Sequence, residues 1–211
     1  MFLLALNWLT PSYGHYELLS RRTLLKTHGQ QLEFAACTNN LDAARTAASA
    51  LGGTLYWDPR EQFSHLPFRA LVTCVTDDPT QLQDAADIGL YVVCRRIIKP
   101  GEPKYVGLFP LVHHPKLTHA QADAHWRDQH APLTFAHHAA MSHYSQLSVV
   151  HRLSGPEIDG FALCGFDSLE DLREQFYSLP DSAKVIAADI QKFADTKKSP
   201  RRLVATVESF G

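Results

Sequence analysis

A short break rich in proline and glycine divides the chain into two parts. The segment Lys99–Lys104 reads KPGEPK and separates two apolar runs. Prolines and a glycine so close together disfavour both a helix and a central strand. We therefore expect two units, residues 1–99 and residues 105–211. The linker allows them little separation, although two independent halves on a tether remain the alternative.

The part after the break alternates between strand and helix patterns. Thr118 and Gln121 form a capping-box pattern, and Pro132 disfavours continuation of the helix that they begin. Period-two and helical apolar spacings indicate the remaining elements. Strands are predicted at Tyr105–His113, Ser145–Leu153, Gly160–Phe166 and Arg202–Phe210, with helices at Thr118–Gln129, Ser168–Leu179 and Ser182–Asp195. This β-α-β-β-α-β order is typical of a ferredoxin-like fold.

The part before the break is a looser copy of this order. Strands are predicted at Phe2–Leu9, Phe68–Val75 and Gly89–Ile98, and helices at His15–Thr27, Leu41–Leu51 and near Thr80–Ala86. We expect an α+β fold with two ferredoxin-like (βαββαβ) halves. Each sheet would have one face covered by helices. The two remaining faces would pack against each other.

Charge and cysteine usage exclude several classes of function. The net charge is −2 without a basic stripe, so no nucleic-acid partner is expected, and the basic run Lys197–Arg202 is interpreted as a solvated turn. No run of about 18 apolar residues predicts a membrane span, and Met1–Leu9 lacks the features of a signal peptide. The four cysteines are widely separated, as in reducing compartments. We expect a cytoplasmic protein.

Five of the twelve histidines lie within Ala124–Tyr144, which raises the question of a metal site. His125 and His130 are five residues apart and would point about 140° apart on an α-helix. The chain has no HExxH motif, and adjacent histidines diverge in regular structure. A composite site that includes His143 stays an alternative, but we predict neither metal nor cofactor.

Trp126 and His130 form the most promising chemical pair. They are four residues apart and share one helix face. His130 would lie near the helix C-terminus, where the helix dipole raises the pKa of an imidazole. A histidine titrating near neutrality beside an aromatic wall is suited to proton transfer. The alternative is a histidine that only caps the helix carbonyls. No nucleophile motif or phosphate-binding loop is present.

Three further residues are candidates for the same site. Tyr144 and Gln146 are two apart on a predicted strand, so they share a sheet face and could donate hydrogen bonds to an oxyanion. Alternatively, they are a rim residue and a cross-strand hydrogen bond. Asp159 precedes Gly160 and could contact substrate, or it could only stabilise a turn.

Six short segments in order resemble the EthD domain of the dimeric α+β barrel superfamily. They are PKLT (Pro115–Thr118), WRDQHAPL (Trp126–Leu133), YSQL (Tyr144–Leu147), DGF (Asp159–Phe161), FDSLEDL (Phe166–Leu172) and the terminal VESF. The resemblance covers about residues 105–210. It implies two four-stranded sheets face to face, in a homodimer or an intramolecular pseudo-dimer. The N-terminal part lacks the W-x-x-x-H element, so it looks like a degenerate second copy.

The resemblance implies a small-molecule substrate or ligand and no membrane partner. Our leading hypothesis is a cofactor-independent lyase or isomerase acting on a small cyclic or aromatic carbonyl compound. His130 and Tyr144 would be catalytic, and Trp126, Gln146 and Asp159 would bind substrate. Many family members have an acidic residue where this chain has Leu163-Cys164, which leaves His130 with fewer partners. The alternatives are a non-catalytic binding protein and a haem- or metal-dependent oxidoreductase.

Overall fold

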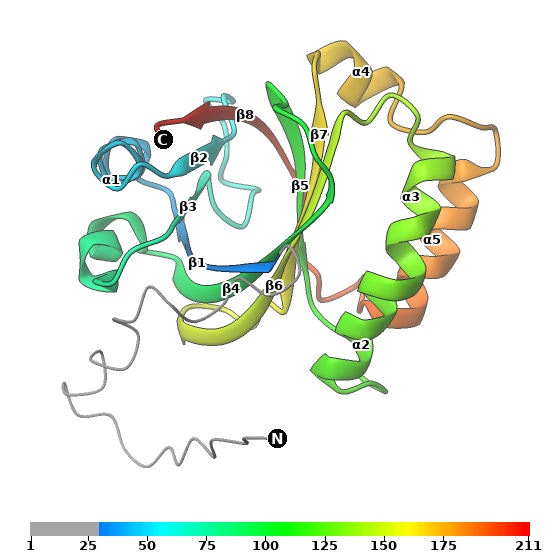
Figure 1. Cartoon of the computed structure of the whole chain (residues 1–211), viewed down its shortest axis with the longest axis horizontal. Helices are drawn as coiled ribbons and strands as arrows, with labels where there is room; N and C mark the ends of the chain where they lie inside the picture. The colour runs from blue at the N-terminus through cyan, green and yellow to red at the C-terminus, as the bar shows by residue number, and fades with distance from the viewer. Residues whose placement is uncertain (1–29) are drawn as a thin grey trace.

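Eight strands form a closed barrel in the computed structural model, which describes residues 30–211 (Figure 1). We call residues 30–99 the N-terminal half and residues 105–211 the C-terminal half. The first half comprises β1 (Gln30–Thr38), α1 (Leu41–Ala50), β2 (Thr54–Trp57), β3 (Ala70–Cys74), η2 (Pro79–Ala85) and β4 (Gly89–Lys99). The second comprises β5 (Tyr105–Leu111), α2 (His119–His125), η3 (Trp126–His130), α3 (Ala131–His137), β6 (His143–Ser154), β7 (Gly160–Phe166), α4 (Leu169–Glu174), α5 (Ser182–Phe193) and β8 (Leu203–Ser209).

The strands join the two halves at both edges. Their order around the barrel is β1-β3-β2-β8-β5-β7-β6-β4, with antiparallel neighbours throughout. β2 pairs with β8, and β4 pairs with β6, so each half supplies one strand to each seam. The expected α+β barrel is confirmed, and strand pairing at both seams joins the two sheets that were expected to pack face to face. Independent halves on a tether are excluded. The barrel closes within one chain because backbone hydrogen bonds are made at both seams.

The N-terminal half begins differently from the sequence-based prediction. Its first described strand is β1, and the short strand β2 was also not predicted. β1 contains two glutamines, a glutamate and two alanines, a composition with low strand propensity. It is nevertheless central to its sheet, because it pairs with both β3 and β4. The predicted strand Phe2–Leu9 and helix His15–Thr27 lie outside the described residues.

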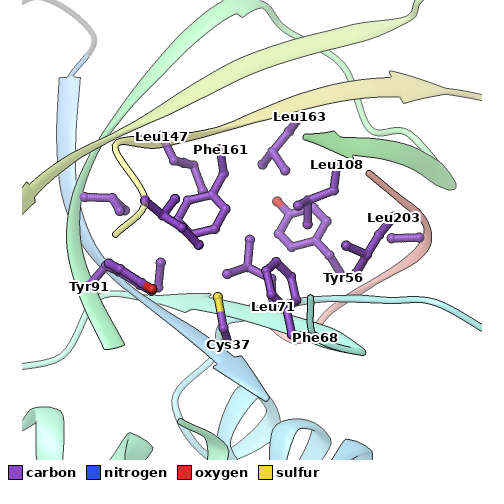
Figure 2. Packing of buried hydrophobic residues seen from close by; sticks show 14 of the residues in the cluster. Cys37, Tyr56, Phe68, Leu71, Tyr91, Leu108, Leu147, Phe161, Leu163 and Leu203 are labelled. Atoms are coloured by element: carbon purple, nitrogen blue, oxygen red, sulfur yellow. The ribbon is translucent and has the colours of Figure 1, made fainter. Parts of the chain in front are cut away.

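Apolar side chains fill the inside of the barrel (Figure 2). Phe161 packs edge-on against Tyr91 and Phe68, with ring centroids 5.6 and 6.3 Å apart. Every strand contributes to this core. Its other labelled members are Cys37, Tyr56, Leu71, Leu108, Leu147, Leu163 and Leu203. The interior is therefore a packed core, and a site would lie in the helical layers outside it.

A charged pair is buried among the strands. Both nitrogens on one edge of the Arg95 guanidinium bond to the Glu33 carboxylate, at 2.7 and 2.8 Å. Arg95 also donates to the hydroxyls of Thr73 and Ser145, so most of its donors are satisfied. The hydroxyl of Ser145 is 3.1 Å from Nε2 of His143. Because β1, β3, β4 and β6 all take part, this network ties the two halves together across a seam.

The helices lie outside the barrel on two opposite sides (Figure 1). α1 and η2 cover the N-terminal half, and α2, η3, α3, α4 and α5 cover the C-terminal half. In the described part of the chain, none of these helices has the length and apolarity needed to cross a membrane. The C-terminal layer is larger and contains His119, His125, His130 and His137.

Glu33→Ala should destabilise the protein by about 3 kcal/mol, because it leaves the buried guanidinium of Arg95 without its counter-charge. Urea denaturation measures the change. Asp128→Ala is the matched control: it breaks the exposed pair Arg127–Asp128 and should cost about 0–1 kcal/mol. Equal losses in the two variants would contradict the structural role given to the buried pair.

Candidate functional site

One continuous helical segment with a π-helical turn at its centre carries the candidate pair. α2, η3 and α3 follow one another without a break, and the predicted capping box of Thr118 and Gln121 is present. In the π turn, the amide of Ala131 donates to the carbonyl of Trp126, five residues earlier. Pro132 stands in the first turn of α3, where its missing N–H is tolerated. The prediction that the helix ends close to His130 is therefore wrong.

The π turn brings two histidines to one carboxylate. His125 Nε2 lies 3.1 Å from Asp189 Oδ1, and His130 Nδ1 lies 2.9 Å from Asp189 Oδ2. Lys192 Nζ also donates to Asp189, at 3.1 Å. The predicted divergence of about 140° assumed an α-helix. A π turn bonds residue i to residue i+5, so His125 and His130 lie on the same side of the segment.

His130 is buried rather than placed at an open helix end. Only 7% of the surface of His130 is exposed, and its ring packs against the ring of Phe193 with centroids 5.1 Å apart. Burial lowers its pKa, although the hydrogen bond to Asp189 opposes this change. The predicted rise is wrong because the helix continues to His137 and the dipole effect of a terminus is absent.

Tyr144 and Gln146 hold Trp126 in place. The hydroxyl of Tyr144 accepts a hydrogen bond from Trp126 Nε1 at 3.0 Å, and Gln146 Nε2 donates both to that hydroxyl and to the Trp126 carbonyl. Both side chains are fully buried, and burial raises the pKa of Tyr144. Gln146 Oε1 has no partner among residues 30–211. The structure thus brings three of the predicted site residues together, with their donors directed at one another.

Gly160 allows Trp126 to lie directly on the sheet. A Cβ atom at position 160 would be 2.6 Å from Cζ3 of the indole and 3.0 Å from the carbonyl oxygen of Leu147. Any larger side chain would displace the ring. Gly160 is the first residue of β7, and its lack of a side chain sets how closely Trp126 packs on the sheet.

A small cavity lies between the sheet and this helical layer. Its volume is about 20 Å³, enough for one water molecule. Trp126, Asp159 and His119 line it, together with Leu111, Val112, His113, Ala122, Asp123, Gly160, Phe193 and Ala194. Two predicted site residues, Trp126 and Asp159, therefore face the cavity. His130, Tyr144 and Gln146 do not line it.

Two imidazoles share the carboxylate of Asp159. His119 Nδ1 lies 2.9 Å from Oδ1, and His113 Nδ1 lies 2.8 Å from Oδ2. The backbone amide of His113 also donates to Oδ2, at 2.7 Å. Burial would raise the pKa of Asp159, but these hydrogen bonds outweigh it and lower the pKa to about 2. The hydrogen bond from His119 to the Asp159 carboxylate in turn raises the pKa of His119 above 6.5.

The N-terminal half contributes an arginine that contacts two of the residues lining the cavity. Arg96, on β4, makes two hydrogen bonds of 2.7 Å to the carboxylate of Asp123 on α2. Its guanidinium carbon also lies 5.5 Å from the centroid of Trp126. Burial would raise the pKa of Asp123, but the bonds from Arg96 outweigh it and lower the pKa.

Sequence reasoning missed His113, His119, Asp189 and Arg96. The other clustered histidines have separate partners, since His137 contacts the hydroxyl of Ser182 and His138 contacts the carbonyl of Phe176.

Within residues 30–211, no group of three or more histidine, cysteine, aspartate or glutamate side chains is arranged to hold a metal ion.

Comparison with known protein families finds one match within the C-terminal half. Residues 114–197 match the EthD domain. The matched segment contains Trp126, His119, Asp159 and Asp189, while Arg96 lies before it. No curated protein matches the chain.

Three solved structures align with most of this chain. An anthrone oxidase-like protein aligns with a TM-score of 0.53 at 10% identity, covering 88% of this chain and 95% of that one. A provisionally named monooxygenase from Lactobacillus acidophilus NCFM gives 0.47 at 11% identity, covering 87% and 97%. Another from Fusobacterium nucleatum gives 0.48 at 7% identity, covering 86% and 95%. The likeness of the first supports the fold alone.

Gly160→Ala should destabilise the protein by roughly 1–3 kcal/mol, because the added methyl group overlaps the indole of Trp126. Chemical denaturation measures the loss. The same substitution in a Trp126→Leu background is the control, since a smaller side chain leaves room for the methyl group. If Gly160→Ala costs as much in that background, contact with the indole is not the cause.

The free energy of unfolding should fall as the pH drops below about 6.5, in part through His130. The pKa of its imidazole is lowered by folding, so the unfolded chain takes up the proton more readily in acid. His130→Gln should lose less stability than the wild type between pH 7.5 and 5.5. Denaturation curves at the two pH values measure this, with the exposed His65→Gln as control. An equal acid loss in His130→Gln and wild type would contradict this account.

Proposed function

We propose that the chain is a tandem of two ferredoxin-like units, residues 1–99 and 105–211, of which the first is a degenerate EthD-like copy. The order of strands supports this proposal. In each half the first strand lies between the third and the fourth, and the second strand lies at one edge. The cavity with its histidines lies in the helical layer of the second unit, the one that contains the EthD match.

We propose that this cavity is the active site of an enzyme acting on a small molecule. The reaction we infer is cofactor-independent proton transfer on a small cyclic or aromatic carbonyl compound, as in a lyase or isomerase. The observation that carries it is the pair His119–Asp159 at a cavity with an aromatic wall. A carboxylate that stays ionised and fixes one ring nitrogen of a half-exposed histidine is suited to general base catalysis.

The chemistry follows from the two nitrogens of His119. Its Nδ1 donates to Asp159 Oδ1, which leaves Nε2 with the free electron pair. Nε2 would take a proton from the carbon next to the substrate carbonyl, and the C–H electron pair would move onto the carbonyl oxygen as an enolate. Returning the proton to another carbon of the enolate completes an isomerisation. In a decarboxylation, the electron pair would come from the bond to the departing CO2, and protonated His119 would supply the proton.

Other residues would support this pair. His113 holds the second oxygen of Asp159 through its backbone amide and its ring, so the carboxylate cannot rotate away from His119. Trp126 would provide the flat wall for an aromatic substrate. Sequence reasoning assigned the proton to His130 and the oxyanion to Tyr144. Neither lines the cavity, and we now propose that they position Trp126 and its helix.

The small size of the cavity bears equally on the enzyme and on a rival function, a non-catalytic binding protein. A volume of about 20 Å³ does not admit an aromatic substrate unless a lining residue moves. A non-catalytic small-molecule binding protein would need the same opening but no proton transfer. The side chain of His119 is 41% exposed, which makes it the natural residue to move on ligand entry.

The test uses anthrone, a flat ketone whose methylene protons are acidic, as a probe in D2O. The wild-type protein should accelerate exchange of these protons for deuterium, measured by NMR. His119→Gln should lower the protein-dependent rate by about 10²–10⁴-fold, the range for loss of a general base. His65→Gln, at an exposed histidine that does not line the cavity, is the matched control and should keep the rate. Binding of anthrone without exchange would favour the binding protein, and oxygen consumption would point to an oxidase.

The exchange rate should rise with pH, with a midpoint above 6.5, because the base must be neutral and its pKa is raised by Asp159. Asp159→Asn removes the charge that stabilises the imidazolium. It should therefore move the midpoint to lower pH and reduce the maximal rate. A midpoint that stays in place would show that another group is the base.

A further inference from the structure

The two seams of the barrel carry the same arrangement of side chains. At one seam, Arg96 of β4 bonds to Asp123 of α2 and lies 5.5 Å from the ring of Trp126. At the other, Glu208 of β8 bonds to Arg45 of α1, at 2.8 and 2.9 Å. Arg45 in turn lies 5.5 Å from the ring of Trp57. In both cases a side chain on the last strand of one half bonds to a side chain on the first described helix of the other half. The arginine lies on the strand at the first seam and on the helix at the second.

The two bridges differ in burial and in their surroundings. The side chain of Arg45 is 40% exposed, whereas that of Arg96 is only 7% exposed. Arg96 Nε is buried without a hydrogen-bond partner among the described residues, a cost that Arg45 does not bear. Asp123 lines the cavity with His119, and no histidine lines the groove beside Arg45. The Arg45–Glu208 pair therefore links the two halves without leaving a buried guanidinium nitrogen unpaired.

We propose that Arg96 is a positioning residue for the proton-transfer site: it holds Asp123 and Trp126 and so keeps His119 paired with Asp159. This inference rests on the proposed function of the cavity. The site is then incomplete without the N-terminal half, although that half contains no histidine of the cavity. The degenerate half would contribute one guanidinium to the chemistry of the other.

Four charged or titratable groups act on His119 or on its partner Asp159. Asp159 bonds to it directly, and Asp123 lies one helical turn along α2, where its negative charge also favours the imidazolium. Arg96, on β4, opposes this effect. His113 approaches the same Asp159 from the end of β5. Without Arg96, Asp123 would be free to compete with Asp159 for the imidazole, and its charge would act on His119 without compensation.

Three variants test whether Arg96 and Asp123 act on His119. The two single variants should shift the titration midpoint of His119 in opposite directions. In Arg96→Met, the titration midpoint of His119 should rise, because the charge of Asp123 is no longer neutralised. In Asp123→Asn, the midpoint should fall, because the positive charge of Arg96 is then unopposed. In the double variant, both charges are absent and the midpoint should return close to the wild-type value.

The measurement is the histidine ring NMR signal as a function of pH in the full chain. The His119 signal is assigned by its absence in His119→Gln. Arg45→Met is the matched control and should leave the midpoint unchanged. The midpoint of the anthrone exchange rate should move in parallel, and Arg96→Lys should restore it only in part, since lysine keeps the charge but not the two-pronged contact. If Arg96→Met does not fold, Asp123→Asn alone decides the sign.

An unchanged His119 midpoint in both single variants would overturn the inference, as would an equal shift in Arg45→Met. The two proposals fail separately. Shifted midpoints without anthrone exchange would support the role of Arg96 at His119 and remove the proposed reaction. Exchange that depends on His119 but not on Arg96 would support the reaction and overturn the role of Arg96.

Discussion

Pairing of the strand edges between the two halves is the constraint on which the rest of the structure depends. An isolated four-stranded sheet has two edges with unpaired amides and carbonyls, which are prone to unspecific pairing. Here the long strands β4 and β6 pair over most of their length, and β2 pairs with β8 on the far side. This closure fixes the register between the halves. It therefore also fixes how far a side chain of β4 can reach into the opposite helical layer.

The residues of the candidate site come from three parts of the structure that this closure holds together. The sheet supplies Asp159 just before β7, the helix supplies His119 and Trp126, and the opposite half supplies Arg96. Tyr144 and Gln146 use their polar groups to anchor the indole. Polar networks that are almost fully satisfied restrict motion. The wall of the cavity is thus more firmly held than the histidine at its edge.

Much of the C-terminal half could be predicted from the sequence. β7 matches its predicted bounds, the capping box places α2, and the two predicted site residues Trp126 and Asp159 lie on the wall of one cavity. The missed residues have a physical explanation. Asp189 is 59 positions from His130, and no local pattern links α5 to the π turn.

The π turn itself limits prediction from periodicity. Its hydrogen bonds change the angular relation between His125 and His130, and no local rule distinguishes WRDQHAP from an α-helix broken by proline. β1 escaped prediction for a different reason. Its place between β3 and β4 comes from tertiary pairing, which overrides the low strand propensity of its residues.

Closure of the barrel within a single chain has a consequence for how such a protein can change. In a barrel built from two identical chains, every substitution occurs twice, so a residue useful at one seam must also be acceptable at the other. In this chain the two seams vary independently. At one seam the arginine is buried, lies on a strand and stands beside histidines. At the other seam the arginine is more exposed and lies on a helix. Closure within one polypeptide thus permits the two seams of one barrel to carry different side chains and different degrees of burial.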